Sequence, residues 1–131
     1  MSHWPVIEFP DVELWATAWL RPQLADWSPF VSNQLTTHTK AFAVIVRDDS
    51  GPDGLVTAER RVGVRVIGTD KVRTGALARR VAALLRGAAR PDTPVAAVGS
   101  IRGPYRIDSP DSTQVEYYLT AELTVVGHQL T

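Results

Sequence analysis

The stretch QVEYYLTAELTVV, from Gln114 to Val126, does most to decide the fold that we expect for this chain. Apolar and polar residues alternate along it, so the two sets point to opposite sides of an extended backbone. The set expected to be buried is Val115, Tyr117, Leu119, Ala121, Leu123 and Val125. A period of two residues predicts a strand with one buried face, and most strands stop after about 5–6 residues. This strand is therefore unusually long.

The length of this strand raises a pairing problem. At about 3.3 Å per residue it would span on the order of 40 Å, whereas a chain of this size has a radius of gyration near ~14 Å. Its expected partner, Pro94–Ile107, is interrupted by Gly99, Gly103 and Pro104 and cannot pair cleanly along its length. The unpaired edge of a long strand is a liability unless another chain covers it. We therefore predict that neighbouring subunits bury the edge or the end of this hairpin.

The first half of the chain predicts a helix followed by extended segments. A helix is expected over about 11–21, capped by Asp11, with one further turn to Leu24 left open because Pro22 disfavours continuation. Phe30–Leu35 is either a short strand or an extended connector. Within Lys40–Arg47, both alternating sets of positions contain apolar residues. This is typical of a central strand covered on both faces.

The second half predicts a hairpin, a helix and two strands. DDSGPDG (Asp48–Gly54) is dense in turn residues, and Ala58–Val66 then alternates as a strand buried on one face. A second helix should begin at Asp70 or Thr74 and end at Gly87. This order predicts an α+β fold in which a mainly antiparallel or mixed sheet of four to five strands packs with two helices. We expect a single domain over residues 1–131.

The composition limits the classes of protein to consider. The chain has 131 residues, 44% of them hydrophobic, which is enough for a real core. Its 14 basic and 14 acidic residues argue against a free-standing nucleic-acid binder, which usually carries a basic excess. With no cysteine, disulfides and thiolate–metal sites are excluded. We see no signal-peptide pattern and no window near the ~18 apolar residues of a membrane span, so we expect a cytoplasmic product without a membrane partner.

The sequence offers little that points to catalysis. His3, His38 and His128 are far apart and have no second ligand at a metal-binding spacing. The acidic loop fails the calcium pattern of the EF-hand in both registers, because Asp53 stands at position 6 when counting starts at Asp48, and Arg60 at position 12 when it starts at Asp49. We expect a solvated turn there, no metal, no cofactor and no enzymatic activity.

The charged and aromatic residues leave alternatives open. Arg47, Arg60, Arg61 and Arg65 are expected to line one sheet face, where solvated charge is the ordinary interpretation. The alternative is bidentate pairing across a subunit seam with Glu59, Glu116 and Glu122. Of the tryptophans, we expect Trp15 and Trp19 in the core, and Trp4 is a candidate interface anchor in the N-terminal arm.

Three segments resemble one family of proteins. PDVELWATAWLRPQLADW (Pro10–Trp27) resembles the opening of tail terminator proteins of long-tailed, siphovirus-type phages that infect actinobacteria. GPYRIDSPDSTQVEYYLTAELTVVGHQ (Gly103–Gln129) is similar to their last hairpin, and TDKVRTGALARRVAALLRG (Thr69–Gly87) matches their middle helix in position and character. The chain departs from them in its tryptophan-rich start and its proline-containing Asp48–Gly54 loop.

This resemblance implies a structural role in a phage particle. The chain would form a hexameric ring that caps the head-proximal end of the tail tube, stops tube polymerisation and provides the joint to the head–tail connector. Its partners would be copies of itself, the tail tube protein and the connector or neck proteins, with DNA only passing through the channel. It would be assembled in the host cytoplasm and reside in the virion. The alternatives are another neck or head-closure protein of the particle, or a small enzyme or ligand-binding domain.

One set of residues is expected at subunit seams or ring faces. They are Trp4, Asp48, Asp49, Asp53, Arg60, Arg61, Arg65, Tyr105, Arg106, Asp108, Asp111, Glu116 and Glu122. Most are charged, which suits contacts that must reject wrong partners through opposed like charges.

Overall fold

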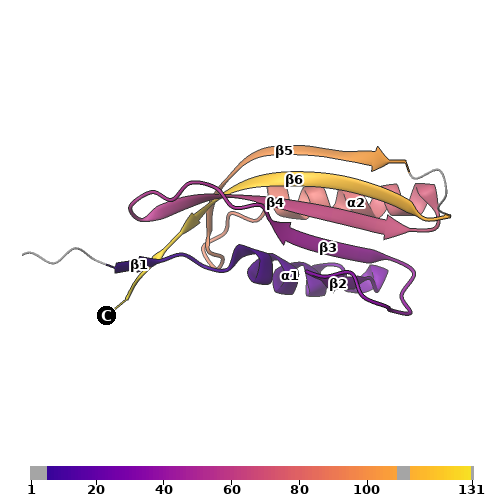
Figure 1. Cartoon of the computed structure of the whole chain (residues 1–131), viewed down its shortest axis with the longest axis horizontal. Coiled ribbons are helices and arrows are strands. Elements are labelled where there is room, and N and C mark those ends of the chain that lie inside the picture. The colour runs from indigo at the N-terminus through magenta and orange to yellow at the C-terminus, as the bar shows by residue number, and fades with distance from the viewer. Residues whose placement is uncertain (1–5, 109–112, 131) are drawn as a thin grey trace, which may run out of the picture.

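The computed structural model describes residues 6–108 and 113–130, so the predictions made for Trp4 and Asp111 lie outside the described residues. Two α-helices and two β-sheets make up this part of the chain, which confirms the α+β prediction (Figure 1). In chain order the elements are β1 (Val6–Glu8), α1 (Val12–Gln23), the 3-10 turn η1 (Ala25–Trp27), β2 (Phe30–Ser32), β3 (Ala43–Asp48), β4 (Thr57–Gly68), α2 (Lys71–Arg86), β5 (Val95–Ile107), β6 (Val115–Val126) and β7 (His128–Leu130).

The main sheet has five strands in the order β2-β3-β4-β6-β5. β2 runs parallel to β3, and the other neighbours are antiparallel, so the sheet is mixed. Both helices pack against this sheet (Figure 1). β1 and β7 form a separate two-stranded antiparallel sheet, which brings the first and last described strands together at one end of the molecule (Figure 1).

The long strand β6 lies inside the sheet, which corrects the prediction that its edge is unpaired. It pairs with β4 along its whole length, from Val115 opposite Gly68 to Val126 opposite Thr57. On its other side it pairs with β5. The sequence predicted only Pro94–Ile107 as a partner of this strand. β4 is the second partner, and it can pair along the whole of β6 because each strand has 12 residues. The backbone of β6 is therefore satisfied within one chain.

The outer strand is β5, and it pairs as irregularly as its glycines and proline predicted. Its register with β6 shifts three times, between Val95 and Ala97, between Val98 and Ile101, and between Arg102 and Tyr105. Bulges and charged side chains are common ways to prevent an edge strand from pairing with another chain. The opposite edge, β2, is only three residues long. Neither edge offers a long, flat ladder for a neighbouring subunit.

Helix α1 begins where predicted and ends later. The side chain of Asp11 accepts a hydrogen bond from the backbone N–H of Leu14 at 3.0 Å, which caps the helix. The helix continues through Pro22 to Gln23, beyond the expected end at residue 21. Pro22 stands in the last turn, where a missing N–H removes a single helical bond. The backbone N–H of Leu24 then closes the helix onto Leu20 and Arg21.

The tryptophans of α1 are less buried than predicted. Val12, Ala16 and Leu20 are fully buried and fill the core face of the helix. Trp15 and Trp19 are half-buried and stack on each other with ring centroids 5.4 Å apart. They pack against the core from its margin, because their spacing places them beside the buried stripe rather than on it.

Helix α2 matches its prediction at both ends. The side chain of Asp70 accepts hydrogen bonds from the backbone N–H groups of Val72 and Arg73, and Gly87 stands at the C-terminal cap. Leu77, Val81 and Leu85 are fully buried. The apolar stripe therefore faces the sheet, as the sequence indicated. In the part of the chain that the structure describes, neither helix is long and apolar enough to cross a membrane.

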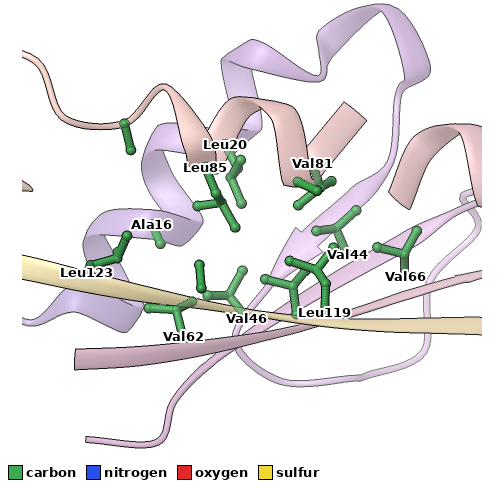
Figure 2. Packing of buried hydrophobic residues seen from close by; sticks show 14 of the residues in the cluster. Ala16, Leu20, Val44, Val46, Val62, Val66, Val81, Leu85, Leu119 and Leu123 are labelled. Carbon is green, nitrogen blue, oxygen red and sulfur yellow. The ribbon is translucent and has the colours of Figure 1, made fainter. Parts of the chain in front are cut away.

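The core lies between the helices and one face of the sheet (Figure 2). Strand, α1 and α2 side chains meet there: Ala16, Leu20, Val44, Val46, Val62, Val66, Val81, Leu85, Leu119 and Leu123. Leu119 is completely buried as predicted, and Tyr117 is half-buried against the same cluster. On the opposite face, Ala43 and Ile45 of β3 form a small second cluster with Ile67. β3 is thus buried on both faces, which confirms the prediction for Lys40–Arg47.

Candidate functional site

The sheet face that points away from the main core, here called the open face, carries most of the charged candidates. Arg61 lies directly opposite Glu122 in the register and pairs with it at 3.3 Å. Arg65 donates two hydrogen bonds to Glu116, at 3.2 and 2.7 Å. The hydrogen bonding that Arg65 donates to Glu116 is the largest influence on the pKa of the Arg65 guanidinium and raises it above its ordinary value. Both pairs form within one chain, so these arginines have carboxylate partners without the pairing across a subunit seam that the sequence left open as an alternative.

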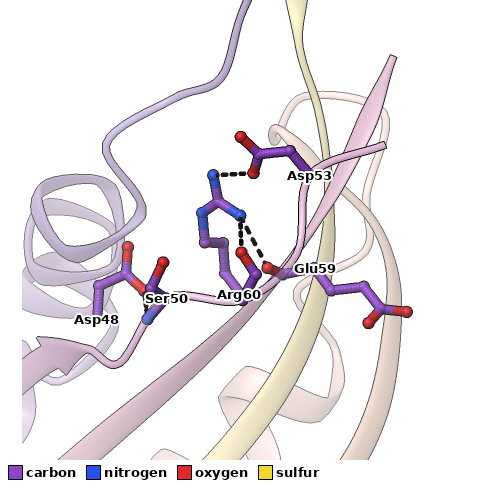
Figure 3. A network of polar contacts seen from close by, with 6 residues as sticks. Asp48, Ser50, Asp53, Glu59 and Arg60 are labelled. Carbon is purple, nitrogen blue, oxygen red and sulfur yellow. Dashed lines mark hydrogen bonds and ion pairs between the residues drawn. The ribbon is translucent and has the colours of Figure 1, made fainter. Parts of the chain in front are cut away.

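Arg60 does not belong to the open face, which corrects the prediction that it lines one face with Arg61 and Arg65. Consecutive strand residues point to opposite faces, and Arg60 pairs in register with the buried Leu123. Its side chain is only 12% exposed and contacts Asp53 at 2.7 Å (Figure 3). The guanidinium also lies 5.6 Å from the ring centroid of Phe9. Arg60 therefore anchors the acidic loop and the N-terminal segment to the body.

A pair of adjacent substitutions tests this assignment. We expect Arg60→Ala to lower the free energy of unfolding by about 1–2 kcal/mol, because it removes a mostly buried stem and leaves one loop carbonyl and one carbonyl of β4 without this donor. Arg60 donates to the backbone oxygens of Gly51 and Glu59 at 3.1 and 2.9 Å. Arg61→Ala is the matched control and should cost less than ~1 kcal/mol, since its ion pair is solvent-exposed. Urea unfolding measures both, and equal losses would contradict the anchoring role.

The acidic loop extends the hairpin instead of reversing it. The backbone N–H of Asp49 donates to Arg61 O at 2.7 Å, and the N–H of Glu59 donates to Pro52 O at 2.9 Å. The chain reverses further on, where the N–H of Gly54 donates to Thr57 O at 2.7 Å. The turn residues of Asp48–Gly54 therefore form an irregular arm. The chain reverses direction at Leu55 and Val56.

A polar groove lies between this loop and the open face, with a volume of about 380 Å³. Its charged lining residues are Asp49, Glu59, Arg60, Arg61 and Glu122. Both arginines are already engaged, Arg60 by Asp53 and Arg61 by Glu122. Within residues 6–108 and 113–130, no three His, Asp or Glu side chains are grouped so that they could hold a metal ion. The groove is thus mixed in charge, and its arginines hold the protein's own carboxylates.

Two tyrosines meet edge to face on the open face. The rings of Tyr105 and Tyr118 have centroids 5.8 Å apart at an interplanar angle of 70°. Burial raises the pKa of Tyr118 above its ordinary value of 10.0, and the negative charge of Asp49 is the next largest cause. Tyr105 was expected at a seam, and its side chain is largely exposed.

The raised pKa of Tyr118 predicts a response to alkaline pH. The folded state keeps the phenolic proton more tightly than the unfolded chain. Its contribution to stability is therefore complete below the ordinary pKa of 10.0 and is lost as pH rises through the folded-state pKa. We expect the free energy of unfolding to fall more steeply above this pH in the wild type than in Tyr118→Phe. Urea titrations at a series of pH values measure the two slopes, and parallel curves would rule out the assignment.

The remaining predicted site residues are scattered. Asp48 ends β3, where its backbone N–H donates to Glu13 of α1 at 2.9 Å and its side chain accepts from Ser50 N at 2.6 Å. Arg106 pairs with Asp108 at 3.0 Å at the end of β5, far along the sheet from the acidic loop. The structure therefore gathers the candidates into two separate regions instead of one site.

Exposed apolar side chains at one end of the molecule were not among the predicted site residues. This hairpin-end patch consists of Val6, Leu55, Val56, Val126 and Leu130. Leu55 is 86% exposed and Val56 is 56% exposed. The backbone oxygen of Val56 accepts from Gly127 N at 2.9 Å, and Val6 lies opposite Leu130, so the patch joins the hairpin tip to the β1–β7 sheet. The signal in the sequence was an apolar pair inside a turn-rich stretch.

A second group of exposed apolar side chains lies at the other end of the long strands. It consists of Val72 in the first turn of α2 and of Tyr105 and Ile107 near the end of β5. Tyr105 and Ile107 pair in register with Tyr118 and Glu116 and therefore lie on the open face, whereas α2 covers the opposite face of the sheet, so Val72 does not share a surface with them. Val72 is 76% exposed, although it stands beside the well-formed helix cap at Asp70.

No protein-family model matches this chain, and no curated protein matches it in sequence. Its function therefore has to follow from its own residues and their geometry.

Proposed function

We propose that this chain is a structural subunit of a long-tailed phage, the tail terminator, which assembles as a ring on the head-proximal end of the tail tube. The observation that carries the proposal is the hairpin-end patch, in which Leu55 and Val56 stand on an arm that projects beyond the core (Figure 1). The three segments that resemble tail terminators, and the α+β fold that this resemblance implies, support the same role.

The physical case rests on the cost of leaving such an arm uncovered. Apolar area exposed to water is unfavourable by roughly 25 cal/mol per Å², and a hairpin tip can easily carry polar residues instead. Here two adjacent apolar side chains occupy the tip, and Val126 and Leu130 extend the surface. A subunit that works inside an assembly would bury them against a neighbour.

The proposed mechanism is steric. One face of the ring docks on the last ring of the tube, and the other face lacks the surface that a further tube subunit needs. Open-ended stacking requires two matching faces, so a ring that presents only one of them ends the polymer. The exposed ends of the ring would then hold the connector, and DNA would pass through the central channel.

Imaging of intact particles tests the role. Particles that carry this chain with a short epitope fused at the exposed Leu35 loop should bind the labelled antibody at the head-proximal end of the tail. A fusion at the buried Ala88 would disturb the fold, so the loop is the better site. Label elsewhere in the neck would assign the chain to head closure or connection, and particles without label would remove the proposed role.

A further inference from the structure

We infer that the centre of the open face binds an acidic segment of a partner protein, and that Arg47 and Arg102 hold the carboxylates of that segment. Recognition of such a segment goes beyond the proposed function and does not depend on a role in a phage tail. Three features of the open face support it: the register of four strands, the free guanidinium groups of the two arginines, and the charge around them.

The first feature is a row of residues that crosses the open face. Arg47 of β3 lies opposite Gly63 of β4, which lies opposite Thr120 of β6. Thr120 in turn lies opposite Arg102 of β5. Residues directly opposite each other in antiparallel strands project from the same face, so both arginines stand on the open face with two small residues between them. Three strand spacings of about 4.8 Å put their Cα atoms roughly 14 Å apart.

The second feature is that neither of these arginines is held by a carboxylate of the described chain. Arg61 and Arg65, on the same face, both pair with glutamates of β6. Across residues 6–108 and 113–130, the side chains of Arg47 and Arg102 take part in no ion pair or hydrogen bond, and both residues are exposed. A guanidinium binds a carboxylate through two parallel hydrogen bonds. Two free guanidinium groups on either side of small residues therefore suit an acidic ligand.

A tyrosine hydroxyl adds a further donor to this row. A Cβ built on Gly63 would lie 2.5 Å from the hydroxyl oxygen of Tyr118, so this oxygen occupies the space above Gly63. Burial is the largest influence on the raised pKa of Tyr118, and the positive charge of Arg47 acts in the opposite direction. That influence is expected when the guanidinium lies near the phenol. The missing side chain of Gly63 thus leaves room for a hydroxyl beside Arg47.

The third feature is the charge of the open face, which favours an acidic protein segment over nucleic acid. Asp49 contributes a carboxylate near Tyr118, where its charge is the second cause of the raised pKa after burial. Two free arginines against this one aspartate leave a net positive charge, which suits one or two carboxylates. A nucleic-acid backbone carries a charge at every phosphate and would also have to pass Glu116 and Glu122 on the same face.

A short synthetic peptide provides the probe. Acetyl-Glu-Ser-Tyr-Ser-Glu-amide places its two glutamates about 13 Å apart in an extended backbone, which matches the separation of the two arginines. Its central tyrosine points to the same side and can pack against the ring of Tyr118. The control peptide carries lysine in place of both glutamates, and a double-stranded DNA fragment is the polyanion control. NMR titration of the isotope-labelled full chain at low ionic strength gives each affinity and shows which residues respond.

The expected results depend on the sign of each charge. The glutamate peptide should bind and the lysine peptide should not. Arg47→Ala and Arg102→Ala should each weaken binding about fivefold, the effect of losing one exposed ion pair. Arg80→Ala is the matched control and should leave the affinity unchanged, because Arg80 is exposed on α2 over the opposite face. Asp49→Asn should strengthen binding by a similar factor, a gain that a damaged fold could not produce.

Several outcomes would overturn the inference. They are a glutamate peptide that does not bind, a lysine peptide that binds as well, and the same affinity in Arg47→Ala, Arg102→Ala and Arg80→Ala. DNA that binds through the two arginines while the peptide does not would also overturn it and assign the row to nucleic acid. If circular dichroism shows that an alanine variant is unfolded, Arg47→Gln or Arg102→Gln replaces it, with the same fivefold loss expected.

Discussion

Leu119→Ala is expected to lower the free energy of unfolding by about 2–5 kcal/mol, because it leaves a cavity at a site where rigid neighbours cannot close in. Leu119 has no exposed area and lies opposite Val64 at the middle of the β4–β6 ladder. Its side chain points into the cluster that also holds Val81 of α2 (Figure 2). Urea unfolding monitored by tryptophan fluorescence should show a lower midpoint with an unchanged slope.

The neighbouring residue provides the control for this cavity. Thr120 stands on the same strand but points to the open face, opposite Gly63, and is half-buried. Thr120→Ala should cost less than ~1 kcal/mol, since it removes a methyl and a hydroxyl from a surface position. Similar losses for the two substitutions would show that strand propensity, and not core packing, explains the result.

This pair of residues also shows how much of the fold could be predicted from the sequence. The alternation along Gln114–Val126 predicted which side of the strand is buried, because parity follows directly from extended backbone geometry. It could not predict the neighbours of the strand. α2 and β5 lie between β4 and β6 in the chain. Pairing between strands so far apart in sequence leaves no local pattern.

The arginines show the same limit within the site. Arg60 and Arg61 are consecutive strand residues and so point to opposite faces, and the prediction that they share one face was wrong. The partner of Arg60 could not be predicted from the sequence, because its contact with Asp53 depends on the path of the irregular loop beside β4. Glu116 and Glu122 were identified as partners of arginine, but whether a pair forms within or between chains depends on register.

The exposed apolar side chains at the two ends of the molecule could be located only from the structure. Leu55 and Val56 are visible in the sequence as an apolar pair, yet the surrounding glycines and aspartates indicated only a turn. Val72 and Ile107 are 35 residues apart in the chain, and only the topology places them at the same end of the sheet. Groups of exposed apolar side chains contributed by distant segments therefore cannot be found from periodicity.

Gly68→Ala is expected to destabilise the protein by about 2–3 kcal/mol, because the core has no room for one more methyl group there. Gly68 is the last residue of β4 and is buried where the chain turns into α2. A Cβ at this position would lie 2.3 Å from Oγ1 of Thr74 and 3.0 Å from a ring carbon of Phe42. Thr74 is completely buried in the first turns of α2, so it cannot swing out into solvent.

A second substitution should reverse most of this loss. Among the described residues, Oγ1 of Thr74 has no hydrogen-bond partner, so Thr74→Ala alone should change stability little. In the double variant the removed hydroxyl makes space for the new methyl group, and we expect a coupling of about 1–2 kcal/mol in a double-mutant cycle. Gly87→Ala is the control for the added methyl itself, because its Cβ would meet nothing nearer than 3.7 Å and its φ is an ordinary −93°. An additive cycle, with Gly68→Ala as costly in the Thr74→Ala background as in the wild type, would mean that the crowding lies elsewhere, with Phe42 as the next candidate.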